Sequence, residues 1–292
     1  MKNSWILVVL SWLATCSAPT PVPPPTAHPH YQLGSAYQKN GYWFYPAEDF
    51  SLDSTGLATI LPPGRSGTTD DGELIDDSTL TAGMQTLQLP AIVTVTNLQN
   101  GLQLQVRVND RAPADPGRLI ALSPRAALLL QITAQNPAKV RVVIDAGQSR
   151  HLIDQLGGGP RIQVALATPG KVTAQDLPPP GQGGAGASHS LGLNDQDAAT
   201  ETVPDRLPER LSRVGTRPGQ LYLRAGSFGR ARYAVERSAR LTGLGSDVIS
   251  SRDGRETIFS VRAGPYASVQ EADRALATAF ARGVIDARIT VE

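Results

Sequence analysis

The sequence has little of what several protein classes require. Its 292 residues include one cysteine, Cys16, so no internal disulfide can form. Its 27 basic and 26 acidic side chains leave a net charge of +1, which gives no electrostatic bias toward nucleic acid or an anionic membrane. No His and Cys cluster has metal-site spacing, no glycine-rich loop has phosphate-site spacing, and no serine-centred nucleophile elbow occurs. We therefore expect no metal, no cofactor and no nucleic-acid partner.

The N-terminus has an apolar run at residues 5–13, which is too short to cross a bilayer and has the length of a signal-peptide core. The run follows Lys2 and ends in Leu-Ala-Thr-Cys. This pattern resembles a bacterial lipoprotein signal over residues 1–16, in which Cys16 becomes the lipidated first residue and anchors the protein to a membrane. An ordinary signal peptide cleaved nearby is the alternative. By analogy with such lipoproteins, Ser17 favours the outer membrane.

Glycine and proline are abundant, with 28 and 23 residues, and they predict long linkers between folded regions. Residues 17–30 form a proline-rich tether, which has too little apolar surface for a core. Clustered proline and glycine also predict a flexible linker within residues 147–217. Two folded regions remain, at residues 31–146 and 218–292.

The first folded region has the pattern of a small β-barrel. Residues 91–98 are rich in β-branched side chains, and residues 102–108 alternate between apolar and polar. Asn100 and Gly101, between these segments, form a strong hairpin-turn signal. A short helix is predicted after Ser123, which suits a helix N-cap. Short strands with few helices follow from these signals.

The last region contains an internal repeat. The segments LYLRAGSF (221–228) and FSVRAGPY (259–266) each read as a strand that a helix follows. The second helix has a capping box at Ser268 and Glu271, and Gly283 ends it. One more strand closes the chain, so the order is β-α-β-β-α-β.

This C-terminal unit resembles a SPOR domain, on the doubled strand-Arg-Ala-Gly motif and the helix that follows each copy. SPOR domains bind peptidoglycan glycan strands without stem peptides, which are enriched at division septa, and the glycan lies on the open face of the sheet. The resemblance implies that Arg224 and Arg262 contact glycan. A ferredoxin-like packing module without a ligand is the alternative.

The first region resembles the double-psi β-barrel of the rare lipoprotein A (RlpA) family. The resemblance rests on YWFYPAED (42–49), GE (72–73), LTA (80–82) and VRVNDR (106–111), and on the order of signal, tether, barrel, linker and SPOR unit. The implied fold is mainly β plus α+β: a double-psi β-barrel, a linker and a small βαββαβ SPOR domain. The implied protein is an outer-membrane lipoprotein that faces the periplasm at the division septum, with divisome proteins as further partners.

Active members of this family are endolytic lytic transglycosylases that act on peptide-free peptidoglycan. In that reaction the C6 hydroxyl of N-acetylmuramic acid attacks its own anomeric carbon, so the enzyme must protonate the leaving oxygen and deprotonate the hydroxyl. One carboxyl with a raised pKa can do both in turn. The resemblance implies Asp110 as this acid/base and Glu73 as a second acid. It also implies that Asn109 and Arg111 position Asp110 or bind sugar. A turn in which Asp110 accepts backbone N–H groups and pairs with Arg111 is the alternative.

The sequence departs from the family pattern near this motif. The position of the family histidine is Met84, whose side chain cannot exchange protons. The family's Ser-Trp-Tyr-Gly is replaced by Thr-Ile-Leu-Pro at residues 59–62. A second hypothesis is therefore a catalytically inactive peptidoglycan-binding lipoprotein that organises the septum.

Overall fold

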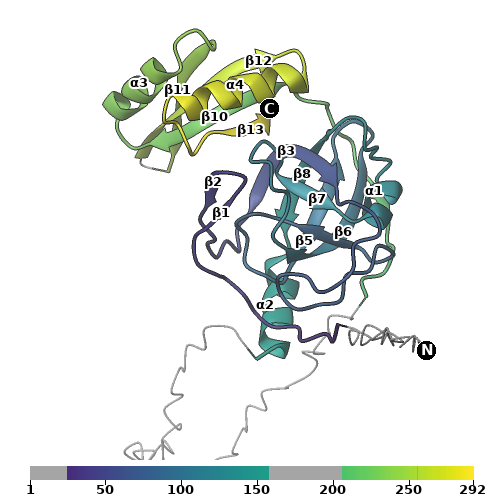
Figure 1. The fold of residues 1–292 in the computed structure, drawn as a ribbon. Coiled ribbons are helices and arrows are strands. Elements are labelled where there is room, and N and C mark those ends of the chain that lie inside the picture. Colours follow the sequence, from purple (N-terminus) through teal and green to yellow (C-terminus); the bar gives the residue numbers. More distant parts are fainter. Residues whose placement is uncertain (1–24, 158–205, 255) are drawn as a thin grey trace, which may run out of the picture.

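The computed structural model describes residues 25–157, 206–254 and 256–292 (Figure 1). The expected signal peptide with Cys16, and most of the expected linker, lie outside these residues. Within the described part, no helix is both long and apolar enough to cross a bilayer.

Six strands of the first region close into a barrel, as the sequence predicts. They follow the order β4-β7-β3-β8-β5-β6, and β6 pairs back to β4. The β3–β7 and β4–β6 pairs are parallel and the others are antiparallel, which is the mixed arrangement expected of this barrel class. The strands are β3 (Asp53–Ile60), β4 (Thr81–Gly83), β5 (Ala91–Asn97), β6 (Leu102–Asp110), β7 (Ile120–Leu122) and β8 (Ala138–Ile144).

The hairpin between β5 and β6 forms where the Asn-Gly pair predicts it. Gly101 has a φ of +75°, which glycine adopts without strain, and the Asn100 side chain accepts the Leu102 N–H at 2.9 Å. Along the first part of β6, Leu102 and its alternate neighbours are buried in the barrel while Gln103 lies at the surface. The period-two pattern therefore sets which face of β6 enters the core.

Two helices flank the barrel. In α1 (Pro124–Leu129) the Ser123 hydroxyl accepts the Ala126 N–H at 3.2 Å, which confirms the predicted cap. The second helix, α2 (Ala146–Gln155), packs on β5, where Ser149 Oγ accepts the Ile92 N–H at 2.9 Å. Because α2 begins at residue 146, ordered structure continues past the boundary expected there.

Residues 206–217, which we call the strap, contact the barrel, although they were expected to belong to a flexible linker. Within the strap, the short strand β9 (Ser212–Arg213) pairs with the start of β6. Ahead of it, the Glu209 carboxylate accepts hydrogen bonds from Nε and Nη2 of Arg125, at 2.6 and 2.5 Å. The strap therefore carries the chain across the barrel to the C-terminal domain.

The C-terminal domain has the predicted β-α-β-β-α-β order, with an antiparallel sheet β11-β12-β10-β13. The predicted cap of its second helix is present, since the Ser268 hydroxyl accepts the Glu271 N–H at 3.2 Å. The elements are β10 (Leu221–Phe228), α3 (Ala231–Arg240), β11 (Ser246–Asp253), β12 (Glu256–Tyr266), α4 (Val269–Ala281) and β13 (Arg288–Val291).

The two domains are docked through β3 and β13, which lie next to each other in Figure 1. Leu57 of β3 is fully buried and belongs to the hydrophobic core of the C-terminal domain. The Thr55 hydroxyl donates to the Val291 carbonyl at 2.7 Å and accepts the Val291 N–H at 3.1 Å. Arg118 forms a two-pronged ion pair with Asp273 of α4, at 2.7 and 2.9 Å. Apolar, backbone and charged contacts thus fix one orientation.

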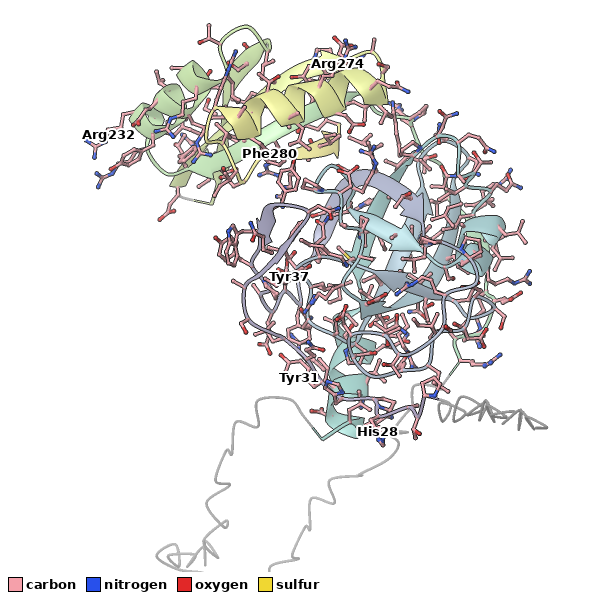
Figure 2. The ribbon with its side chains drawn as sticks, viewed as in Figure 1. His28, Tyr31, Tyr37, Arg232, Arg274 and Phe280 are labelled. Carbon is pink, nitrogen blue, oxygen red and sulfur yellow. The ribbon has the colours of Figure 1, made fainter. Side chains whose placement is uncertain are left out.

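A separate hairpin, β1 (Tyr37–Lys39) and β2 (Tyr42–Phe44), bridges the domains from the barrel side. The Phe44 ring is buried and stacks on Tyr37, with ring centroids 5.3 Å apart. The next contact crosses the domain boundary, because the Tyr42 ring lies 5.0 Å from that of Phe280 on α4, which points toward the barrel in Figure 2. Trp43, which lies between Tyr42 and Phe44 in sequence, is 55% exposed.

Candidate functional site

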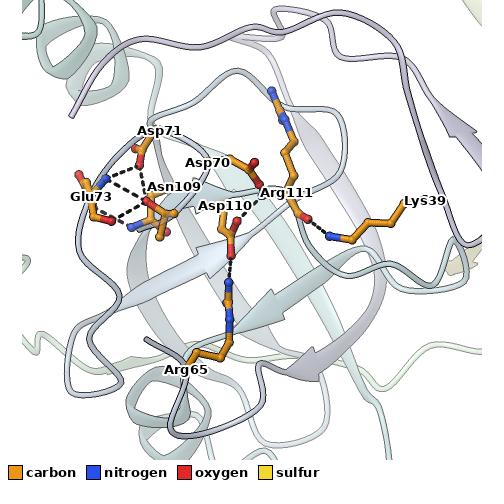
Figure 3. A network of polar contacts seen from close by, with 9 residues as sticks. Lys39, Arg65, Asp70, Asp71, Glu73, Asn109, Asp110 and Arg111 are labelled. Atoms are coloured by element: carbon orange, nitrogen blue, oxygen red, sulfur yellow. Dashed lines mark hydrogen bonds and ion pairs between the residues drawn. The ribbon is translucent and has the colours of Figure 1, made fainter. Parts of the chain in front are cut away.

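The predicted site residues of the barrel gather at the C-terminal end of β6 (Figure 3). Asn109 and Asp110 end the strand, and the 61–80 segment that joins β3 to β4 crosses over them and brings Glu73. The connection is long because β3 and β4 are not neighbours in the sheet, since β7 lies between them.

Asp110 is a buried carboxylate, 5% exposed, with two strong partners. Its Oδ2 pairs with Nη2 of Arg65 at 2.5 Å, and its Oδ1 accepts the Arg111 N–H at 2.9 Å. The predicted alternative of a self-capping turn is therefore present in part, because the backbone N–H bond exists. The ion pair, however, is made by Arg65 and not by Arg111.

Asp70 is a second carboxyl at Asp110 that the sequence does not predict. Asp70 Oδ2 accepts the same Arg111 N–H at 2.8 Å, and the two carboxyls hydrogen-bond to each other. Burial and this bond raise the pKa of Asp70. Burial acts to raise the pKa of Asp110 too, but the bonds from Asp70 and Arg65 outweigh it and lower that pKa. Of the two carboxyls, Asp70 is therefore the one that binds a proton more readily.

Glu73 lies beside this pair with different partners. Its Oε1 pairs with Nη1 of Arg107 at 2.7 Å, and its Oε2 accepts Nδ2 of Asn109 at 2.7 Å. Both carboxylate oxygens are therefore held, and the Glu73 side chain is only 15% exposed. Since Asn109 and Asp110 are consecutive, the structure brings the two predicted acids to one strand end.

Asp71, between Asp70 and Glu73 in sequence, is fully buried, and its Oδ2 has no hydrogen-bond partner among the described residues. Burial, with the negative charge of Glu73 as the second cause, raises the pKa of Asp71 from 3.8 to about 7. A carboxyl of this kind is neutral in the folded protein over much of the acid range, although it is ionised in the unfolded chain.

Replacing Asp71 with Asn should raise stability at alkaline pH. The unfolded chain releases the Asp71 proton near pH 3.8 and the folded chain near pH 7, so folding becomes less favourable as pH rises through this window. Each pKa unit corresponds to about 1.36 kcal/mol, so the loss reaches about 4 kcal/mol above pH 7. Urea unfolding from pH 4 to 8 should show this decline in the wild type and a flatter curve in Asp71→Asn. Parallel curves would contradict the assignment.

Arg111, predicted to position the acid or bind sugar, directs its side chain into the protein. Its Nη2 donates to the Leu33 carbonyl at 2.7 Å, and its Nη1 donates to the Leu87 carbonyl. The segment that carries Met84 is held nearby, because the Met84 N–H donates to the Asp110 carbonyl at 3.0 Å. Met84 is buried and lines a crevice that lies between the two domains. Asp110 lines a different cavity.

The cavity at Asp110 is closed in this conformation. It has a volume of about 10 Å³, and its lining includes Arg65, Thr69 and Ile75 of the crossing segment as well as Asn109 and Asp110. A space of this size holds about one water molecule and no sugar ring. Access to Asp110 therefore requires the segment with Arg65 to move.

The two predicted glycan contacts of the C-terminal domain lie far from this cavity, on the sheet face that its helices leave uncovered. Arg224 and Arg262 are directly paired across β10 and β12, while their sequence neighbours Leu223 and Ala263 enter the core under the helices. Arg262 is bound to Glu292 at 2.6 Å, and Arg224 donates to the Ser227 hydroxyl at 2.9 Å. In the described residues, no group of three or more His, Cys, Asp or Glu could hold a metal ion.

Residues 218–286 match the SPOR domain family. The chain is also similar to proteins named endolytic peptidoglycan transglycosylase RlpA. The Yersinia pestis protein is 40% identical over 123 residues, 40% of this chain and 34% of the relative. The Rickettsia bellii protein is 35% identical over 117 residues, with 39% and 52% covered, and the Escherichia coli K12 protein is 36% identical over 160 residues, with 53% and 42% covered.

The chain thus aligns with about a third to a half of the length of these relatives. Among solved structures, the SPOR domain of Pseudomonas aeruginosa RlpA is 23% identical, with a TM-score of 0.24, and the match covers 25% of this chain and 99% of that one.

Proposed function

The chain belongs to the RlpA family and ends in a SPOR domain, and from this premise we propose that it is an endolytic peptidoglycan lytic transglycosylase. Its substrate is glycan strands without stem peptides. The observation that carries the proposal is the Asp110 carboxylate, which is buried at the end of β6 and accepts the same Arg111 N–H as the Asp70 carboxyl beside it. A proton donor and acceptor in one place is what this reaction needs.

In the proposed mechanism Asp110 acts twice. It first donates a proton to the glycosidic oxygen as the bond to the anomeric carbon breaks. The resulting carboxylate then removes the proton of the muramyl C6 hydroxyl, whose oxygen closes the 1,6-anhydro ring. Asp110 ends the cycle protonated, so the atoms and charges balance without water. Asp70 supplies the exchangeable proton that Met84, at the family's histidine position, cannot supply.

Movement of Arg65 couples substrate entry to this chemistry. The Arg65 charge lowers the pKa of Asp110, and burial acts in the opposite direction. When a glycan strand displaces the Arg65 side chain and takes its place over Asp110, the Arg65 charge no longer lowers the pKa of Asp110, and that pKa rises. A carboxyl with a raised pKa can protonate the leaving oxygen near neutral pH. Closure therefore holds Asp110 in its ionised form, and opening converts it to an acid.

Glu73 and Asn109 have positioning roles in this proposal. Arg107 and Asn109 fix both oxygens of Glu73, so its negative charge lies near the developing positive charge of the sugar ring and stabilises it. Arg111 holds the site together through its backbone N–H, which both Asp70 and Asp110 accept.

The SPOR domain supports targeting to septal peptidoglycan, with Arg224 and Arg262 as glycan contacts. We further propose that Cys16 is lipidated and that the lipid anchors the protein to the outer membrane on its periplasmic side, where divisome proteins are further partners. Incorporation of labelled palmitate in cells, and its loss in Cys16→Ser, would test the anchor.

The activity is tested with amidase-treated sacculi, which present peptide-free glycan. Protein comprising residues 17–292 should release soluble fragments with 1,6-anhydromuramyl ends, identified by mass spectrometry. Untreated sacculi should yield far less product. If no anhydro product forms while the protein still sediments with the treated sacculi, the catalytic proposal fails and the non-catalytic wall-binding hypothesis replaces it.

A further inference from the structure

A crevice lies between the two domains and is lined by residues of both. Its volume is about 660 Å³, within the range of small-molecule binding sites. The barrel lines one side with the β1–β2 hairpin, where Trp43 and Tyr45 are 55% and 61% exposed. The C-terminal domain lines the other side with Arg224, Arg288 and the end of α4.

The charges in this crevice are unequal. Arg224 and Arg288 are paired directly across β10 and β13, so their side chains leave the sheet on the same face. No carboxylate of the described chain lies within ion-pair distance of either. Burial and the positive charge of Arg224 lower the pKa of Arg288, and the negative charge of Asp286 offsets this only in part. All other charged lining residues are neutralised: Arg118 by Asp273, Asp53 by Arg141, Asp286 by Arg237 and Glu292 by Arg262.

We infer that the crevice is a composite binding site for a carboxylate-bearing glycan segment, formed by the barrel and the SPOR domain together. The inference rests on the proposed function for the choice of glycan. Exposed Trp and Tyr rings suit the apolar faces of sugar rings. The paired arginines suit carboxylates, which guanidinium groups bind through charge-assisted hydrogen bonds. Muramyl residues without stem peptides have such a carboxylate, free on their lactyl group.

The composite site depends on domain docking, which the structure provides. The hairpin and the arginines face each other only because Arg118 binds Asp273, β3 lies against β13, and Tyr42 contacts Phe280. Met84 and Gln85 of the barrel line the same crevice. The Met84 N–H donates to the Asp110 carbonyl. Only the backbone at Met84 therefore separates a glycan in the crevice from the backbone of Asp110, the proposed acid/base.

The sequence offers a direct probe of occupancy. Trp43 is the only tryptophan after residue 16, because the other two are Trp5 and Trp12. In protein comprising residues 17–292, tryptophan fluorescence therefore reports on the crevice alone. An Asp110→Asn background prevents turnover of the ligand.

The test is a fluorescence titration with a tetrasaccharide of alternating N-acetylglucosamine and N-acetylmuramic acid with free lactyl carboxylates. We expect saturable change in Trp43 emission, and a Kd at least about tenfold weaker in the double variant Arg224→Gln, Arg288→Gln. The neutral tetramer of N-acetylglucosamine should bind the parent protein at least about tenfold more weakly than the muramyl ligand does. The double variant should bind the two ligands with about equal affinity. Arg232→Gln, an exposed arginine on α3 (Figure 2), is the matched control and should leave the Kd unchanged.

Two results would overturn the inference. One is an unchanged Trp43 signal while the protein still sediments with peptide-free sacculi, because glycan would then bind elsewhere. The other is an unchanged Kd in the double variant, with circular dichroism showing that it is folded. Failure of the proposed enzyme activity is separate, since anhydro products are measured in protein with Asp110 intact and the Trp43 response does not depend on them.

Discussion

Replacing Asp110 with Asn should reduce the release of 1,6-anhydromuramyl products by about 10²- to 10⁴-fold, the range for loss of a general acid or base. Asn has nearly the same shape and can still accept the Arg111 N–H, so the strand end should stay intact. It cannot donate or accept the proton that the reaction moves. The effect should fall on kcat, because the amide still occupies the position of the carboxyl and glycan binding is preserved. The measurement is product release from amidase-treated sacculi.

The matched control for this variant is Asp154→Asn, an exposed carboxyl on α2. It should retain wild-type activity. Thermal unfolding of the Asp110→Asn protein should be cooperative, which separates lost chemistry from lost folding. If folded Asp110→Asn protein produces anhydro products at the wild-type rate, Asp110 is not the acid/base.

Replacing Asp70 with Ala should remove one of two ionisations from the pH dependence of activity. Two adjacent carboxyls titrate in two steps, so activity should rise with the first macroscopic pKa and fall with the second. Without Asp70 a single carboxyl remains, and the bond that lowers the pKa of Asp110 is lost. We expect one limb of the pH profile to disappear, the remaining limb to lie at higher pH, and maximal activity to drop about tenfold. The measurement is kcat/KM from pH 4 to 9 on a soluble peptide-free glycan.

Two neighbouring variants make this prediction specific. Asp70→Asn keeps a hydrogen-bonding group of the same shape but no exchangeable carboxyl proton, so it should lose the ionisation and retain more stability than Asp70→Ala. Asp71→Asn removes an adjacent carboxyl that is not in the pair. If the ionisation disappears in Asp71→Asn and persists in Asp70→Ala, the proton belongs to Asp71 and the assignment of the pair is wrong.

The local elements could be predicted from sequence because their causes are local. The β5–β6 hairpin follows from Asn100 and Gly101, and the start of α4 follows from Ser268 and Glu271, since each signal acts within a few residues. The resemblance of VRVNDR to its family named Asp110 and Asn109 as candidates, and the structure places them together with Glu73. Both domain folds were predicted correctly, from these local signals together with the family resemblance.

The partners of Asp110 could not be predicted in this way. Arg65 and Asp70 lie 45 and 40 positions before Asp110, and only the crossing between β3 and β4 brings them to it. In sequence, Asp70 looks like one member of an acidic surface run. Its pairing depends on burial and on a shared backbone N–H, which are properties of the tertiary structure. The docking of the domains through Thr55 and Arg118 could not be predicted from sequence for the same reason.

The strap has a consequence for how the protein is made. Strand β9 covers the edge of β6 at Leu102 and Gln103, yet it lies 109 or more residues later in the chain. The N-terminal barrel can fold before β9 docks, and the edge of β6 at these two residues then presents unpaired backbone groups. The barrel is therefore most open to wrong strand pairing in the interval before residues 212–213 pair with it.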